Sequence, residues 1–97
     1  MSQTEGALRV RADRRVEGSW EIVRDALMRV GQGIEGVRVE LGEREAFEAA
    51  PDAGAFRDFV EVGVLWHVDL EALEYAAEWL IDEFDWVIDV ARPAYLA

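Results

Sequence analysis

The sequence predicts a single α+β domain spanning residues 1–97, and three patterns support that prediction. Stretches in which apolar and polar residues alternate are typical of half-buried β-strands. Stretches with apolar residues at helical spacing lie between them. Cysteine is absent, so we expect a core that forms without disulfides or metal–thiolate sites. The expected strands are residues 8–12, 37–41, 58–68 and 86–90, and the expected helices are residues 19–30 and 70–84.

The first half of the chain supplies a strand, a helix and a second strand. Residues 8–12 alternate Leu, Val and Ala with two arginines. Ser19 is a residue type that caps helix N-termini, and Gly31 is a typical C-terminal stop. Between them the inward face of the helix is expected to carry Trp20, Val23, Leu27 and Val30.

The second half begins with residues 43–57, a segment that is long for a hairpin. A short helix from Glu43 to Ala50 is expected there, with Phe47 inward, broken at Pro51 and Gly54. Valines and a tryptophan at every second position then predict a long central strand, with Val62, Val64 and Trp66 facing the helices. Asp69 is expected to cap the second helix, which runs to about Phe84, and Pro93 to end the last strand.

The resulting order, β-α-β-β-α-β, is the ferredoxin-like arrangement. It predicts a four-stranded antiparallel sheet in the order 4-1-3-2, with two helices on one face. A β-grasp-like or other α+β sheet is the alternative.

The charge is strongly asymmetric. Residues 1–44 hold eight arginines and eight carboxylates, whereas residues 45–97 hold thirteen carboxylates and two arginines, which gives the net charge of −11. Such a field attracts cationic partners and opposes nucleic acid. We therefore expect a basic protein partner and no nucleic acid.

The second helix carries the main functional hypothesis. Helical geometry points Tyr75 and Trp79 away from its apolar stripe. Aromatic rings among carboxylates favour protein binding, because charge speeds encounter and rings give affinity. We therefore predict a non-enzymatic protein-binding module, in its sharpest form an immunity or antitoxin-like inhibitor. The alternative is that residues 43–57 or the C-terminal tail cover the two rings. The predicted partner-binding residues are Glu71, Tyr75, Glu78, Trp79, Asp82 and Glu83.

A second hypothesis concerns the sheet face away from the helices. Apolar residues expected there suggest that a second copy covers the face, giving a homodimer. One alternative function is thus a dimeric small-molecule-sensing regulatory domain, and another is a small cofactor-free enzyme using His67. The residues expected on this dimer or ligand face are Arg9, Arg11, Arg38, Phe59, Leu65, His67 and Val87.

Other kinds of site find little support. Residues 31–36 match GxGxxG, but a helix precedes them and a strand follows, the reverse of a dinucleotide-binding turn. The acids Asp82, Glu83, Asp85 and Asp89 lack the spacing of a calcium loop. We expect no cofactor and no metal. Because neither a signal peptide nor a membrane-length apolar run is visible, we expect a cytoplasmic protein without membrane contact.

Overall fold

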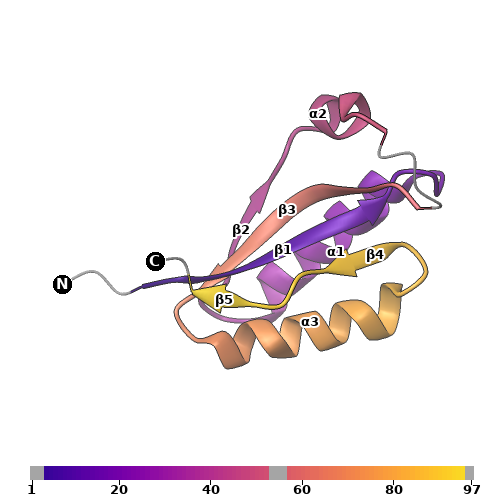
Figure 1. Cartoon of the computed structure of the whole chain (residues 1–97). Helices are drawn as coiled ribbons and strands as arrows, with labels where there is room; N and C mark the ends of the chain where they lie inside the picture. The colour runs from indigo at the N-terminus through magenta and orange to yellow at the C-terminus, as the bar shows by residue number, and fades with distance from the viewer. Residues whose placement is uncertain (1–3, 53–56, 96–97) are drawn as a thin grey trace.

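An antiparallel β-sheet forms the centre of the molecule, in a computed structural model that describes residues 4–52 and 57–95. The elements follow the order β1 (Gly6–Asp13), α1 (Ser19–Gly33), β2 (Arg38–Leu41), α2 (Arg44–Ala49), β3 (Phe59–His67), α3 (Leu70–Phe84), β4 (Ile88–Val90) and β5 (Ala94–Tyr95) (Figure 1). Neighbouring strands follow the path β2-β3-β1-β4, and β5 also pairs with β1. The α+β class is confirmed. The described residues form three helices and five strands, which is one strand more than predicted, and α2 corresponds to the short helix expected between the second and third strands.

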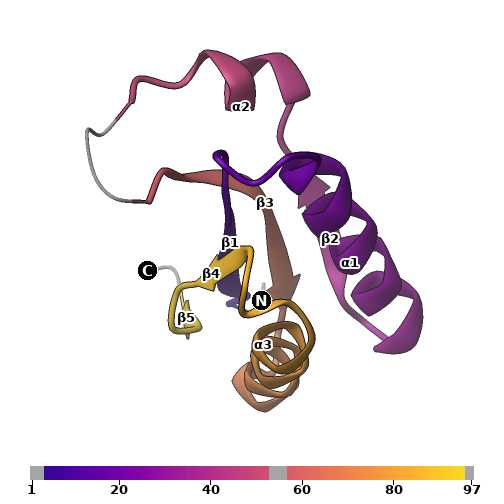
Figure 2. The same cartoon turned by 90° about the vertical axis from the view of Figure 1, so that its right-hand side faces the viewer.

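Helices α1 and α3 cover one side of the sheet, and α2 lies apart from them at one end (Figure 2). The core forms where side chains from β1 and β3 meet the two long helices. Leu8 and Val10 of β1 and Leu65 of β3 are fully buried there against Leu27 of α1 and Leu73 of α3. Burying this apolar surface is the main stabilising contribution to the fold.

A β-bulge changes which residues of β3 face the core. Val10 pairs with Gly63 but its neighbour Arg11 pairs with Glu61, so Val62 is an extra residue in β3. An extra residue reverses the side-chain alternation beyond it. Leu65, opposite Leu8, therefore lies in the core.

The prediction that Val64 and Trp66 face the helices is therefore wrong. Val64 pairs with Arg9 and Glu40, and Trp66 pairs with Ala7 and Arg38. These partners belong to the face of the sheet opposite the core, which we call the open face. Of the three residues predicted to face the helices, Val62 is fully buried in the core.

The ends of the two long helices differ in how they are capped. Asp69 caps α3 as predicted, since its Oδ1 accepts a hydrogen bond from the Glu71 amide at 3.0 Å. The prediction that Ser19 caps α1 is wrong: Ser19 is the first helical residue, and Gly18 precedes it with φ 73°. A left-handed φ of this kind suits glycine. Helix α1 also continues past Gly31 to Gly33.

Helix α2 confirms the predicted short helix, with Phe47 buried. Arg14, at the end of β1, holds this helix in place. Its guanidinium donates to the carbonyl oxygens of Phe47 at 3.2 Å and Glu48 at 3.1 Å, and to that of Ala50. It also pairs with the Asp58 carboxylate at 2.6 Å, and Asp58 is only 5% exposed. Gly54, the second predicted break, lies outside the described residues.

The last predicted strand is shorter than expected. β4 contains only Ile88–Val90, and Trp86 lies in the preceding turn with its side chain exposed. After Pro93 the chain pairs again with β1 as β5, and the Tyr95 hydroxyl donates to the Val68 carbonyl at 3.3 Å.

Candidate functional site

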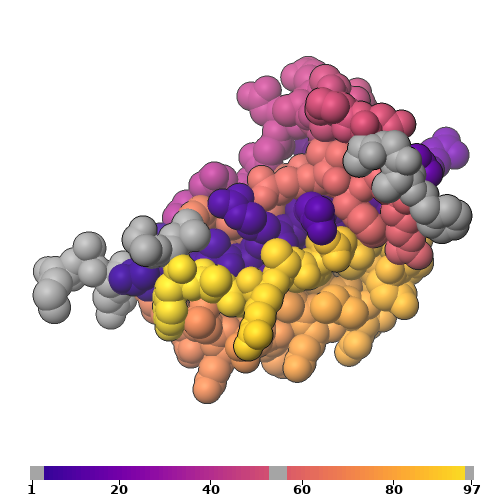
Figure 3. All heavy atoms as spheres, viewed as in Figure 1, coloured from indigo at the N-terminus to yellow at the C-terminus, as the bar shows by residue number. Residues whose placement is uncertain are grey.

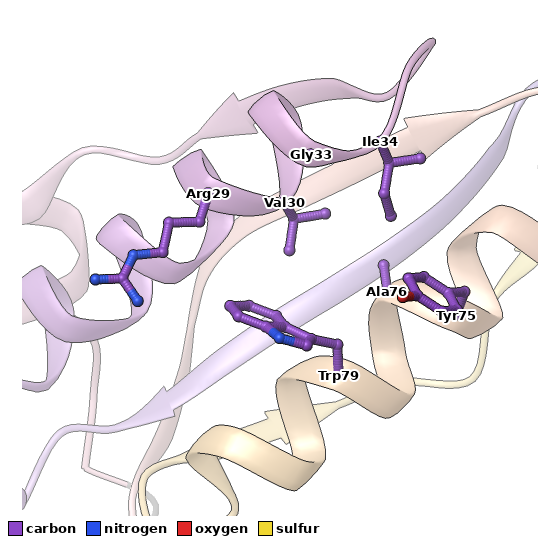
Figure 4. Close-up of a pocket in the computed structure, with 7 residues that line it drawn as sticks. All are labelled: Arg29, Val30, Gly33, Ile34, Tyr75, Ala76 and Trp79. Atoms are coloured by element: carbon purple, nitrogen blue, oxygen red, sulfur yellow. The ribbon is translucent and has the colours of Figure 1, made fainter.

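A shallow apolar groove of about 270 Å³ lies between α1 and α3, and we call it the α1–α3 groove. Figure 4 shows Trp79 reaching from α3 toward α1, with Tyr75 near one end of the groove and Arg29 near the other. The lining residues are Arg29, Val30, Gly33, Ile34, Tyr75, Ala76 and Trp79.

The two rings of α3 have different environments. Tyr75 is 66% exposed, as the predicted outward orientation requires. Trp79 is partly buried against the core, and its ring meets the edge of Phe84 with centroids 5.7 Å apart and planes at 67°. The prediction that both rings point away from the core is therefore wrong for Trp79, which forms one wall of the groove.

The predicted covering of these rings by the tail or by residues 43–57 does not occur in the described part of the chain. β5, which begins the tail, pairs with β1. Helix α2, which contains most of the described part of residues 43–57, lies at the end of the domain opposite α3 (Figure 2). Trp79 is instead covered in part by its own helix and by α1. One side of the groove stays open to the surroundings.

Helix α3 carries uncompensated negative charge. Its five carboxylates make no ion pair with any residue that the structure describes, and the helix contains no basic residue. Four of these carboxylates, those of Glu71, Glu78, Asp82 and Glu83, are on the predicted list, and all four are exposed. Glu74 is a fifth exposed acid that the prediction omitted.

Arg29 is the single cation of the groove lining. It lies on α1, it is exposed, and within residues 4–52 and 57–95 no carboxylate pairs with it. The groove thus has an acidic helix on one side and one guanidinium on the other. A ligand that matches both sides needs positive charge toward α3 and a negative group toward Arg29.

The open face of the sheet differs from α3 because three of its arginines, Arg9, Arg11 and Arg38, form ion pairs within the chain. Arg9 binds Glu61 at 3.0 Å, Arg11 binds Asp89, and Arg38 binds Glu5 at 3.0 Å and Glu40 at 3.4 Å. The hydrogen bond that Arg38 donates to the Glu5 carboxylate is the largest cause that raises the pKa of Arg38 above its ordinary value. Figure 3 views the molecule from the side opposite α1 and shows atoms of β1 and β3 at this surface.

Arginines also cover the rings of the open face. The Arg38 guanidinium lies 5.0 Å from the ring centroid of Trp66, and Arg11 and Arg57 each lie 5.8 Å from that of Phe59. Such cation–π contacts shield aromatic surface from water. Phe59 is therefore placed on this face as predicted, but this chain already covers it in part.

Leu65 and Val87 do not lie on the open face, and their predicted placement there is wrong. Both are fully buried in the core. The bulge turns Leu65 inward, and Val87 follows α3 in the turn that leads to β4, where its backbone bonds to Asp13 and Phe84. The apolar surface that suggested a dimer is thus mainly core, and the homodimer remains a prediction without this support.

His67 also lies away from the paired arginines. It pairs with Gly6 at the end of β3. Its Nδ1 accepts a hydrogen bond from the Asp69 amide at 2.9 Å, which leaves Nε2 as the protonated nitrogen that donates to the Glu35 carbonyl at 3.1 Å. Both ring nitrogens are therefore occupied by backbone groups. This geometry gives His67 a structural role, in which it joins the start of α3 to the loop before β2.

The glycines of residues 31–36 also have structural roles. A Cβ on Gly31 would lie 2.7 Å from a Val39 methyl carbon, and one on Gly36 would lie 2.9 Å from the His67 ring. Gly36 has φ 87°, which favours glycine. These glycines close the last turn of α1 and the loop onto β2, as the order of elements predicts.

Among the described residues no cluster of His, Asp and Glu could hold a metal ion. The helices of that same part of the chain are too short or too polar to cross a membrane.

The two rings of α3 are expected to differ in their effect on stability. Tyr75→Ala removes an exposed ring and is expected to change the free energy of unfolding by no more than about 0.5 kcal/mol. Trp79→Ala removes a ring packed on Phe84 and is expected to cost about 1–3 kcal/mol. Urea unfolding of the two variants measures both values. Equal losses would contradict the described packing.

Sequence reasoning missed the α1 side of the groove, which includes Arg29, Gly33 and Ile34. The sequence signal that could have revealed the groove is a pair of small residues on the two helices. Gly33 on α1 and Ala76 on α3 leave space between the two helices where larger side chains would fill it.

No protein-family model, curated protein or solved structure matches this chain. Its function must therefore be argued from the geometry of its own residues.

Proposed function

We propose that this chain is a non-enzymatic protein-binding module whose α3 surface docks a basic protein. We define the α3 surface as Glu71, Tyr75, Glu78, Trp79, Asp82 and Glu83. The observation that carries the proposal is the contrast in charge pairing within the described residues. Three arginines of the open face, Arg9, Arg11 and Arg38, form ion pairs within the chain, whereas the carboxylates of α3 have no basic partner among the described residues.

The proposed binding uses charge and rings in different steps. Uncompensated carboxylates attract a cationic partner over the Debye length, about 10 Å at 0.1 M salt, and raise the association rate. Exposed aromatic surface at Tyr75 and in the groove then slows dissociation, as aromatic hot spots do. In its sharper form the proposal is an immunity or antitoxin-like inhibitor on a ferredoxin-like scaffold, whose carboxylates enter the cationic site of an enzyme.

The two alternative functions each have less support than the sequence suggested. The dimeric sensor drew on Phe59, Leu65 and Val87, and two of these, Leu65 and Val87, are core residues. The enzyme drew on His67 beside arginine and carboxylate side chains, and the imidazole instead bonds to two backbone groups.

Neutralising two acids of α3 tests the proposal. The source cell's proteins are captured on the wild-type chain, and the captured protein is purified and its association rate measured at several salt concentrations. The double variant Glu78→Gln, Asp82→Asn is expected to slow association about tenfold at low salt and to leave dissociation nearly unchanged.

The matched control removes the same charge elsewhere. Glu17→Gln, Glu45→Gln changes two exposed acids away from α3, neither of which has an ion-pair partner in the described structure. It is expected to associate at close to the wild-type rate. If both double variants slow association equally, the slower rate comes from the change in overall net charge. That result would contradict a docking role for α3.

A further inference from the structure

We infer that the α1–α3 groove binds one face of a basic amphipathic helix from the partner protein. This inference rests on the proposed function and assigns the form of the partner. Helices present apolar anchors to a groove at i and i+3 or i+4, and such docking is a recurring mode of protein recognition. The α1–α3 groove offers an apolar floor of Val30, Ile34 and Ala76, with the Trp79 ring as one wall.

The size of the groove favours side chains over a small-molecule ligand. Its volume of about 270 Å³ is below the range of roughly 300–1,000 Å³ that is usual for drug-sized ligands. It is also partly open to the surroundings, and its lining comes from the two helices α1 and α3. One or two apolar side chains from a neighbouring helix fit such a space.

The charges beside the groove select which helix binds. Glu78 and Asp82 lie one residue before and three residues after Trp79 on α3, and neither has a basic partner among the described residues. Lys or Arg on the partner helix would therefore lie over α3. On the α1 side, Arg29 would receive a carboxylate from the same helix.

A second copy of this chain does not fit these charges. Two α3 helices brought together would place ten carboxylates in one interface with no basic residue on either helix. Like charges in apposition oppose association. The inference therefore commits to a different, cationic protein.

Gly33 makes the groove accessible to a direct test. It lines the groove, and a Cβ added there would meet no atom within 4 Å. Gly33→Leu therefore adds a large side chain at the lining of the groove without a clash at Cβ, and Gly33→Ala is its matched control. Both replacements favour helix more than glycine does, so a loss of binding would not come from unfolding.

The probe is a synthetic helix of about 15 residues, or four turns. It carries Phe and Leu at i and i+4, lysines on one flank of that pair and a glutamate on the other. A permuted peptide of the same composition, with Phe and Leu on opposite faces, retains the charge and loses the apolar stripe. Binding is measured by isothermal titration calorimetry with the wild-type chain and each variant.

The wild-type and Gly33→Ala chains are expected to bind the striped peptide with equal affinity, and Gly33→Leu is expected to bind at least tenfold more weakly. The permuted peptide should bind all three chains weakly and to the same extent. Arg29→Gln should weaken binding of the striped peptide and have no effect when the peptide's glutamate is replaced by glutamine.

The outcomes separate this inference from the proposed function. If Gly33→Leu binds like the wild type while Glu78→Gln, Asp82→Asn weakens binding, the α3 surface binds the peptide and the groove does not. If the Glu78→Gln, Asp82→Asn variant binds the peptide like the wild type, the acidic residues of α3 do not contribute to binding and the proposed function is contradicted. If the striped peptide binds the wild-type chain no better than the permuted one, the amphipathic helix is the wrong partner class.

Discussion

Leu65→Asp is expected to leave the chain unfolded, whereas Val64→Asp, at the preceding position, is expected to fold. Leu65 is fully buried among apolar side chains, where an unpaired carboxylate costs several kcal/mol. That cost is comparable with the whole stability of a small domain, about 5–15 kcal/mol. Val64 lies outside the core cluster, on the open face between Arg9 and Glu40. A carboxylate there would share Arg9 with Glu61 and would lie beside Glu40, so a loss of stability without unfolding is expected.

Far-ultraviolet circular dichroism and thermal melts of the two variants test this prediction. A cooperative melt is expected for Val64→Asp, with a lower midpoint than the wild type because Val64 is only 5% exposed. No cooperative melt is expected for Leu65→Asp. The opposite result would mean that β3 alternates without interruption, as the sequence pattern alone predicts, and that the bulge is absent.

Arg14→Met is expected to cost about 3–5 kcal/mol, the usual loss when one partner of a buried ion pair is removed. The change leaves the Asp58 carboxylate buried beside the core without its guanidinium. It also removes the donor that three backbone carbonyls at the end of α2 share. Helix α2 is therefore expected to detach, and urea unfolding measures the loss of stability.

The control for this prediction is Arg9→Met, which breaks an exposed pair with Glu61. Exposed pairs contribute about 0–1 kcal/mol, so its stability is expected to stay close to that of the wild type. The double variant Arg14→Met, Asp58→Asn should recover part of the loss by removing the unpaired charge. Equal stabilities for Arg14→Met and Arg9→Met would show that Arg14 does not fasten α2.

Local sequence signals predicted most of the elements, because these signals act over a few residues. Asp69 as a cap and Phe47 as the inward residue of α2 are examples. The orientation of β3 was not predictable in this way. An uninterrupted stripe at every second position has no local mark of a bulge, although Gly63 is consistent with one: a Cβ there would lie 2.7 Å from the Glu40 carbonyl oxygen.

The candidate site was predictable on one helix only. Periodicity within α3 identified its acidic outer side and Tyr75, because helical geometry is local. The approach of α1 to Trp79 depends on packing between segments far apart in the chain, which no window of sequence contains. For that reason Trp79 was expected to be exposed, and Arg29 and Gly33 were not recognised as part of the site.

Mapping amide chemical shifts in the isotope-labelled chain, as the captured basic partner is added, tests the location of the site most directly. The largest changes are expected along α3 from Glu71 to Glu83 and along the last turns of α1 that line the groove, with the open face unchanged. Changes centred instead on Arg9, Arg11 and Arg38 would place the partner on the open face and contradict the proposed function.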